Sequence, residues 1–275
     1  MRAHHIRAGC REITSSTNPL LKVFRRALAE GTTRDGWLAV EGPILIEEAL
    51  RAKPQATIHS VLVSDEGLER LRELVRHLPE QSDVARVSDH LFRQVAETQS
   101  PQGIAALVEV HRRSLHSIVQ APNALLLVAC GLQDPGNLGT MMRSAQAFGA
   151  SGVVTMTETV SPFNPKATRA SVGAIFHLPV FVDENPDALL KALRAAGVRI
   201  VATDPRSPSA ISSADLRGSL AVLIGQEAAG IPPEIEGAAD LLLSIPIHPG
   251  MDSLNAATSA SIVLYEVARQ RRFNY

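Results

Sequence analysis

The sequence has no apolar run that approaches the roughly 18–20 residues needed to cross a bilayer. The basic N-terminus, Met1–Arg11, has no apolar segment of the kind that a secretory signal contains. The two cysteines, Cys10 and Cys130, lie far apart and form no metal-binding spacing. These absences predict a cytoplasmic protein with no membrane span and no metal site.

Several motifs of common enzyme classes are also missing. No GxGxxG follows the first strand of an α/β unit with an acid about 20 residues later, which argues against a nicotinamide dehydrogenase and a Rossmann-type methyltransferase. The absence of GxxxxGK[ST] argues against a P-loop NTPase, and no Ser/His/Asp order or carboxylate pair indicates hydrolysis. His248, next to Pro249, is interpreted as a loop histidine rather than a base or ligand.

The net charge is only −1, so the chain is not expected to coat nucleic acid through its overall charge. Charge is concentrated locally, because residues 1–36 carry seven basic and three acidic side chains. This net +4 is compatible with a nucleic-acid-binding patch or with an ordinary solvated helix face.

The 275 residues, 45% hydrophobic and 20% charged, suffice for two domains or one large α/β domain. In the first 110 residues we predict a helix over 18–30, capped by Asn18 and stabilised by Pro19 at its first position. Strands are predicted at 36–42, 58–64 and 103–110, with helices at 43–52 and 67–78. The alternation predicts a small α/β domain over residues 1–112.

Residues 113–123 are predicted to be a linker, and a second domain occupies residues 124–275. Strands are expected at 125–130, 152–156, 177–182, 198–203, 220–225 and 241–245, and helices at 138–148, 164–172, 186–196 and 254–271. Continuous Val/Ile/Leu strands that alternate with helices predict a parallel sheet covered on both faces.

Three loops at strand ends carry unusual polar residues, and ligands bind at the carboxyl ends of such strands. The first, "CGLQDPGNLGTMMRSAQAFGA", contains Asn137 and Arg143, and the second, "LIGQEAAGIPPEI", contains Glu227. The third, "IPIHPGMDSLNAATSAS", has many small and polar residues where a helix should begin. Asp252 or Ser253 would cap that helix, whereas Asn255 is expected inside its first turn, where capping gives it no role.

These three loops, in this order, resemble the three motifs of the SpoU/TrmH-type RNA ribose 2′-O-methyltransferases of the SPOUT class. "PFNPKATRASVGAIFHLPV" resembles the central segment of that family. The N-terminal "NPLLK…VEGPILIEEAL" is similar to the L30e-like substrate-binding domain that many members carry. The fold class that this implies is α/β, with a parallel-sheet domain containing a deep trefoil knot after a small L30e-like domain.

The resemblance implies that S-adenosylmethionine is the methyl donor and that no metal takes part. The residues that it assigns to cofactor binding are Gly225, Glu227, Gly230, Ile231, Ile245 and Leu254. Those that it assigns to catalysis are Arg143, Asn137, Ser253 and Asn255. A guanidinium is a poor base, so Arg143 is expected to anchor a phosphate and stabilise the developing alkoxide. The small residues after Ser253 would let the cofactor and the knotted backbone approach closely.

The substrate implied is RNA, most simply 23S-type ribosomal RNA, with transfer RNA methylation as an alternative. A non-catalytic RNA-binding protein of the same fold is a further alternative, against which the presence of the catalytic motif residues counts. The resemblance also implies a homodimer through the second domain. The expected phosphate-contacting residues of the first domain are Asn18, Lys22, Arg25, Arg26 and Arg34.

Overall fold

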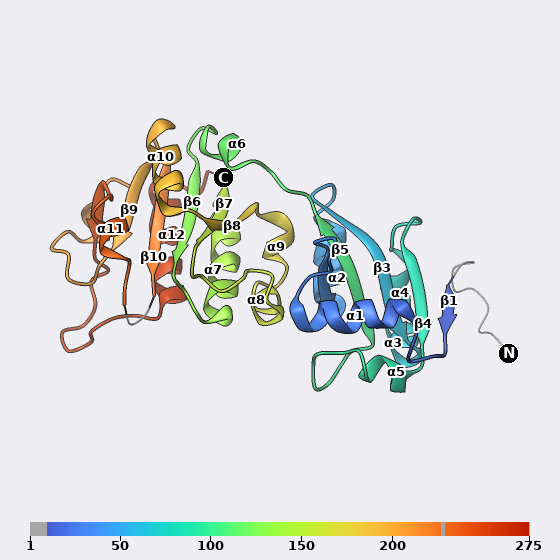
Figure 1. The fold of residues 1–275 in the computed structure, drawn as a ribbon. Coiled ribbons are helices and arrows are strands. Elements are labelled where there is room, and N and C mark those ends of the chain that lie inside the picture. Colours follow the sequence, from blue (N-terminus) through green and yellow to red (C-terminus); the bar gives the residue numbers. More distant parts are fainter. Residues whose placement is uncertain (1–9, 227–228, 275) are drawn as a thin grey trace. The chain divides into compact units, whose positions relative to one another are not determined.

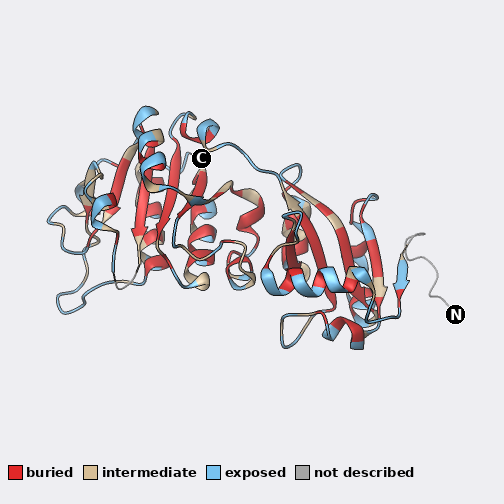
Figure 2. Cartoon of the chain, in the orientation of Figure 1, coloured by how far each residue is buried: buried red, intermediate tan, exposed pale blue. Residues whose placement is uncertain are grey.

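The chain folds into two compact units in a computed structural model that describes residues 10–226 and 229–274 (Figure 1). The first unit runs to His111 and also takes in Phe163–Phe176. The second unit comprises Arg112–Pro162 and the chain from His177 onward. Within each unit, buried strands lie beneath helices whose outer faces are exposed (Figure 2).

The first unit contains a mixed five-stranded sheet of order β1-β4-β3-β5-β2. The strands β1, β4 and β3 are parallel, and β5 runs antiparallel to β3 and β2. The strand bounds are β1 (Arg11–Ile13), β2 (Leu38–Glu41), β3 (Ala56–Ser64), β4 (Asp83–Val87) and β5 (Ile104–Val110). The helices are α1 (Pro19–Glu30), α2 (Pro43–Arg51), α3 (Asp65–Arg70), α4 (Arg72–Arg76), α5 (Asp89–Arg93), α8 (Pro165–Ala170) and α9 (Ala174–His177).

Helix α1 forms as its sequence predicts. Asn18 Oδ1 accepts a hydrogen bond from the Leu20 amide at 2.9 Å, and Pro19 occupies the first helical position. The apolar stripe of α1 is buried and packs on one face of the sheet, with Phe24 fully enclosed. The stripe therefore fixes which face of α1 points to solvent.

Two features of this unit differ from the sequence prediction. The helix predicted over 67–78 is broken at Leu71 into α3 and α4. The strands β1 and β4 and the helix α5 were not anticipated, because each spans only three to five residues and gives little periodic signal.

The second unit contains a six-stranded sheet of order β11-β9-β10-β6-β7-β8, in which every pair of neighbours is parallel. This confirms the predicted parallel sheet. The strand bounds are β6 (Leu125–Cys130), β7 (Gly152–Met156), β8 (Val180–Glu184), β9 (Arg199–Thr203), β10 (Leu220–Gly225) and β11 (Leu241–Leu243). The helices are α6 (Leu115–Val119), α7 (Pro135–Ala147), α10 (Pro186–Ala195), α11 (Pro233–Glu236) and α12 (Ala256–Gln270), with a 3-10 turn at Ile211–Ser213.

The segment 113–123, predicted to be a linker, is only partly one. It contains α6, which Ser114 caps through its side chain. Ile118 and Val119 of this helix are buried in the main apolar cluster of the second unit. The packed structure of that unit therefore begins before residue 124.

None of the helices in the described part of the chain is both long enough and apolar enough to cross a membrane. The described residues also contain no group of three or more His, Cys, Asp or Glu side chains arranged to hold a metal ion.

Candidate cofactor pocket and active site

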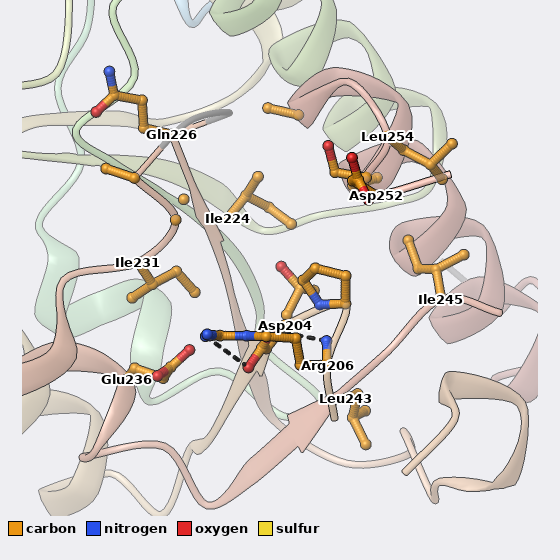
Figure 3. A pocket seen from close by; sticks show the side chains of 18 of the residues that line it. Asp204, Arg206, Ile224, Gln226, Ile231, Glu236, Leu243, Ile245, Asp252 and Leu254 are labelled. Atoms are coloured by element: carbon orange, nitrogen blue, oxygen red, sulfur yellow. Dashed lines mark hydrogen bonds and ion pairs between the residues drawn. The ribbon is translucent and has the colours of Figure 1, made fainter. Parts of the chain in front are cut away.

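A pocket of about 460 Å³ lies at the carboxyl ends of β9, β10 and β11 (Figure 3). This is where a parallel α/β sheet is expected to bind a ligand, and the volume falls in the range of small-molecule sites. Residues of three segments line it: 203–206 at the end of β9, 224–226 and 229–236 from the end of β10 into α11, and 243–259 from the end of β11 into the first turn of α12. The residues therefore come from segments far apart in the sequence.

Five of the six residues predicted to bind a cofactor line this pocket. They are Gly225, Gly230, Ile231, Ile245 and Leu254. In Figure 3, Ile231 lies across the pocket from Ile245 and Leu254, so apolar side chains face one another over the cavity. The sixth residue, Glu227, lies outside the described residues.

The loop after β10 is folded tightly on itself. The Gln226 and Gly230 backbones exchange two hydrogen bonds, of 3.1 and 2.9 Å. A Cβ placed on Gly225 would lie 2.2 Å from the Gly230 carbonyl carbon, and Gly230 has a φ of +71°. Glycine is therefore required at 225 for the close approach of the backbone, and at 230 glycine avoids the strain of a positive φ.

The pocket also has a charged wall that was not predicted from the sequence. Asp204, at the end of β9, is 9% exposed and pairs with Arg206, whose Nε lies 3.1 Å from Asp204 Oδ1. The hydrogen bonds from Arg206 lower the pKa of Asp204 below its ordinary value, so this carboxylate is charged at neutral pH. Glu236 of α11 lines the same pocket. These residues belong to no recognised motif, although their position after a parallel strand would have justified attention to them.

The N-termini of α7 and α12 meet through two asparagines. Asn137 lies in the first turn of α7, and its backbone N–H donates to the capping side chain of Asp134 at 2.8 Å. Asn255 Nδ2 donates to Asn137 Oδ1 at 3.0 Å. The structure thus brings together two of the four residues predicted to be catalytic.

The predicted cap of the last helix was wrong. Asn255 caps α12, since its Oδ1 accepts hydrogen bonds from the Ala257 and Thr258 amides at 2.9 and 3.2 Å. The helix begins later than expected, which leaves Asp252 and Ser253 in the preceding loop, where both line the pocket. Asn255 therefore has a structural role that the sequence interpretation denied it.

The small residues of α12 have a packing role against α7. Ala257 and Ala260 are buried, and the hydroxyl of Ser261 lies 2.7 Å from that of Ser144 on α7. Such short side chains let two helix backbones come close. The run of small residues is therefore explained at least in part by the pairing of these helices.

Arg143 is exposed on α7, and its side chain has no hydrogen bond or ion pair with any described residue. The structure does not join it to Asn137, Ser253 or Asn255. Its charge is thus available to a ligand.

Comparison with known proteins identifies the chain. Residues 124–265 match the model of the SpoU rRNA methylase family, and residues 25–106 match the MRM3-like substrate-binding domain. The chain belongs to the SpoU rRNA methylase family.

Other members of the SpoU family match over nearly the whole chain. The 23S rRNA (guanosine(2553)-2′-O)-methyltransferase RlmP of Bacillus subtilis is 32% identical, over 94% of this chain and 99% of its own. An uncharacterized tRNA/rRNA methyltransferase of Synechocystis is 32% identical, over 94% of each chain. The crystal structure of an AdoMet-bound rRNA methyltransferase from Sinorhizobium meliloti superposes with a TM-score of 0.83 at 29% identity, covering 95% of this chain and 98% of that one.

The five residues predicted to contact RNA differ in whether their side chains already have partners within this member of the SpoU family. The side chain of Asn18 is engaged as the α1 cap, Arg25 Nε donates to the Gln94 carbonyl at 3.1 Å, and Arg26 pairs with Glu30 at 2.8 Å. The side chains of Lys22 and Arg34 are exposed and make no hydrogen bond or ion pair with described residues. Their charges are the least compensated of the set.

Proposed function

We propose that the protein transfers a methyl group from S-adenosylmethionine to a ribose 2′-hydroxyl of RNA. The observation that carries this proposal is the pocket at the ends of β9, β10 and β11, lined by the residues that the family motifs assign to the cofactor. Membership of the SpoU family and similarity to an AdoMet-bound structure support the same reaction.

The pocket suits S-adenosylmethionine chemically. Apolar side chains such as Ile224, Ile231 and Leu243 would enclose the adenine ring, while backbone groups of the described pocket residues that follow β10 would hydrogen-bond its edge and the ribose. The bound cofactor supplies an electrophilic methyl group on a sulfonium centre. Arg206 offsets the charge of Asp204, so Glu236 leaves this part of the wall with a net negative charge, which favours a ligand that carries positive charge.

Catalysis would depend on orienting the hydroxyl and stabilising the oxygen that loses its proton. Arg143 has a free guanidinium, so we assign to it a phosphate contact and stabilisation of the developing alkoxide. Its intrinsic pKa is too high for an efficient general base. Asn137, held by Asn255, would position the ribose, and Ser253 would contact the cofactor from the pocket wall.

Ribosomal RNA is the substrate class that we favour, because the relative RlmP is named as a 23S rRNA methyltransferase. The Synechocystis relative is named for both tRNA and rRNA, so transfer RNA is the second candidate. A ribosomal or transfer RNA substrate would place the protein in the cytoplasm.

We further propose a homodimer through the second unit, with the trefoil knot of the SPOUT class within that unit. Tyr265 of α12 is 47% exposed and makes ring contacts with Phe148 and Phe273, the latter 46% exposed. Exposed aromatic clusters of this kind mark association surfaces. Sedimentation at micromolar concentration tests the dimer, and an active monomer would exclude it.

The reaction is tested by incubating the full chain with S-adenosylmethionine labelled in its methyl group and with ribosomal or transfer RNA. Digestion of the RNA should yield labelled 2′-O-methylribose. Arg143→Ala should lower kcat by at least about 100-fold, as loss of an alkoxide-stabilising donor does elsewhere. Its affinity for S-adenosylmethionine should stay within a few-fold of wild type.

Arg217→Ala is the matched control, because Arg217 is also an exposed arginine of the second unit but pairs with Asp215. It should retain the wild-type rate. Wild-type turnover by Arg143→Ala would refute the role of this arginine. Cofactor binding without methyl transfer to either RNA would favour a non-catalytic RNA-binding protein.

A further inference from the structure

A stacked aromatic pair lies at one end of the first unit's sheet, where β3 begins and β5 ends. The rings of Trp37 and His59 are parallel to within 5°, with centroids 4.2 Å apart. Trp37 is the only tryptophan of the chain, in a sequence with 4% aromatic residues. The proposed chemistry in the second unit uses neither ring.

His59 owes its position to an irregularity in β3. Ile58 pairs with Val108 of β5, but Ser60 pairs with the adjacent Leu107, so His59 is an extra residue in the ladder. A β-bulge re-aims the side chain that it carries, and bulges are frequent beside functional sites. Here the bulge brings the imidazole flat against the indole.

Glu109 of β5 fixes the ring from one edge, since its carboxylate lies 2.8 Å from His59 Nε2. Next to it, Thr57 Oγ1 and His111 Nε2 are 3.0 Å apart. Trp37 packs against the same apolar cluster as Phe24 of α1. The stacked pair therefore lies on the face of the sheet that carries α1.

The stack is not fully enclosed. Trp37 covers one face of the imidazole and Glu109 holds its Nε2 edge, yet 32% of the His59 side chain is exposed. We infer that the exposed part includes the ring face opposite Trp37. The indole N–H of Trp37 donates to no described residue, although half-buried indoles usually have an acceptor.

We propose that this pair is a stacking platform for an unpaired nucleobase of the RNA substrate, an inference that rests on the proposed function. A base would stack on the open face of His59, with Trp37 behind it, and the indole N–H would donate to a base or phosphate oxygen. Single-stranded RNA is held in this way, by stacking on aromatic rings beside basic side chains.

Charges of both signs lie near the platform, with Glu109 against His59 and Arg34 just before Trp37. Arg34 lies in the turn that leads into Trp37, in which the Thr33 amide donates to the Trp37 carbonyl at 2.8 Å. Lys22 extends from the exposed face of α1, the helix on the same side of the sheet. A phosphate next to the stacked base would meet Arg34, and an RNA segment that continues along α1 would reach Lys22.

Because Trp37 is the sole tryptophan, its fluorescence in the full chain reports on the platform directly. Titration with an oligoadenylate of about ten nucleotides should quench the emission. An oligonucleotide of equal length and charge with abasic sites should bind weakly and leave the emission unchanged. Quenching by both to the same extent, or by neither, would overturn the proposal.

Substitution of the outer ring gives an independent measurement. His59→Ala should weaken oligoadenylate binding about fivefold or more, the lower end of what one base–aromatic stack contributes. It should raise KM for RNA without changing kcat or S-adenosylmethionine affinity. His77→Ala is the matched control, because His77 is an exposed histidine of the same unit whose ring, among the described residues, hydrogen-bonds only to the Glu73 carbonyl.

His59→Phe separates stacking from a structural role. It keeps an aromatic ring but loses the contact with Glu109, so RNA affinity should stay within about twofold of wild type. Equal weakening in the Phe and Ala variants would refute the platform, as would unchanged affinity in a folded His59→Ala. Methyl transfer without any quenching would refute the platform and leave the proposed function intact. Quenching without methyl transfer would support the platform and count against the proposed function.

Discussion

Substitution of Asn255 separates two roles that one side chain performs. Its Oδ1 caps α12 and its Nδ2 donates to Asn137. Asn255→Ala removes both. Loss of an N-cap costs about 1 kcal/mol, and loss of an exposed side-chain hydrogen bond about 0.5 kcal/mol. We therefore expect the free energy of unfolding of the second unit to fall by about 1.5 kcal/mol.

For a unit of about 150 residues, this loss lowers Tm by about 3–6 °C. Asn255→Asp is the informative partner, because aspartate caps as well as asparagine and its charge favours a helix N-terminus. It cannot donate to Asn137, however. Its Tm should stay within about 2 °C of wild type, while its methyl-transfer rate should fall as far as that of Asn255→Ala.

The two variants are compared by thermal unfolding, followed by circular dichroism, and by kcat under saturating cofactor and RNA. An unchanged Tm in Asn255→Ala would show that the cap contributes nothing. A wild-type rate in Asn255→Asp would show that the link to Asn137 does not position the reacting groups. Either result would refute that part of the reasoning.

Three further outcomes are expected. Gly225→Ala should abolish S-adenosylmethionine binding in calorimetry, because its Cβ would overlap the folded-back loop, and retained affinity would contradict this. Burial raises the pKa of the Cys130 thiol to about 12. At pH 8, iodoacetamide should therefore modify Cys10 before Cys130, which mass spectrometry would show. Faster reaction of Cys130 would contradict its burial. Lys22→Ala should reduce the slope of log affinity for RNA against log salt by about 1, whereas Arg26→Ala, which loses an already paired charge, should change it less.

The second unit was more predictable from the sequence than the first. The strands β6, β7 and β10 coincide with the predicted ranges, because each is a mostly buried run that contains Val, Leu or Ile and is bounded by loop residues. In the first unit, β1 has three residues and β4 has five, which is too short for a pattern to stand out.

The candidate site was predictable where its residues belong to sequence motifs of a known family. It was not predictable where contacts between distant segments determine the structure. Gly225 and Leu254 were identified through a family resemblance and line the pocket. The start of α12 was placed too early, because Asp252 and Ser253 are as suitable by residue type as Asn255. The stack of Trp37 on His59 depends on a β-bulge, a register shift that no local pattern encodes.

The order of strands in the second sheet has a consequence for how the unit forms. The neighbouring central strands β6 and β10 are paired from Leu125 and Leu220, about 95 residues apart in the chain. Closing such a loop costs about 2 kcal/mol more than closing one of ten residues. Sheets dominated by distant pairings fold slowly, over milliseconds to seconds.

Until β10 arrives, the edge of β6 that it covers has no partner strand. β6 is a wholly buried apolar strand in the finished unit. Unpaired edges of this kind associate with other chains. The yield of refolded protein should therefore decline as its concentration rises, and rapid dilution should favour recovery.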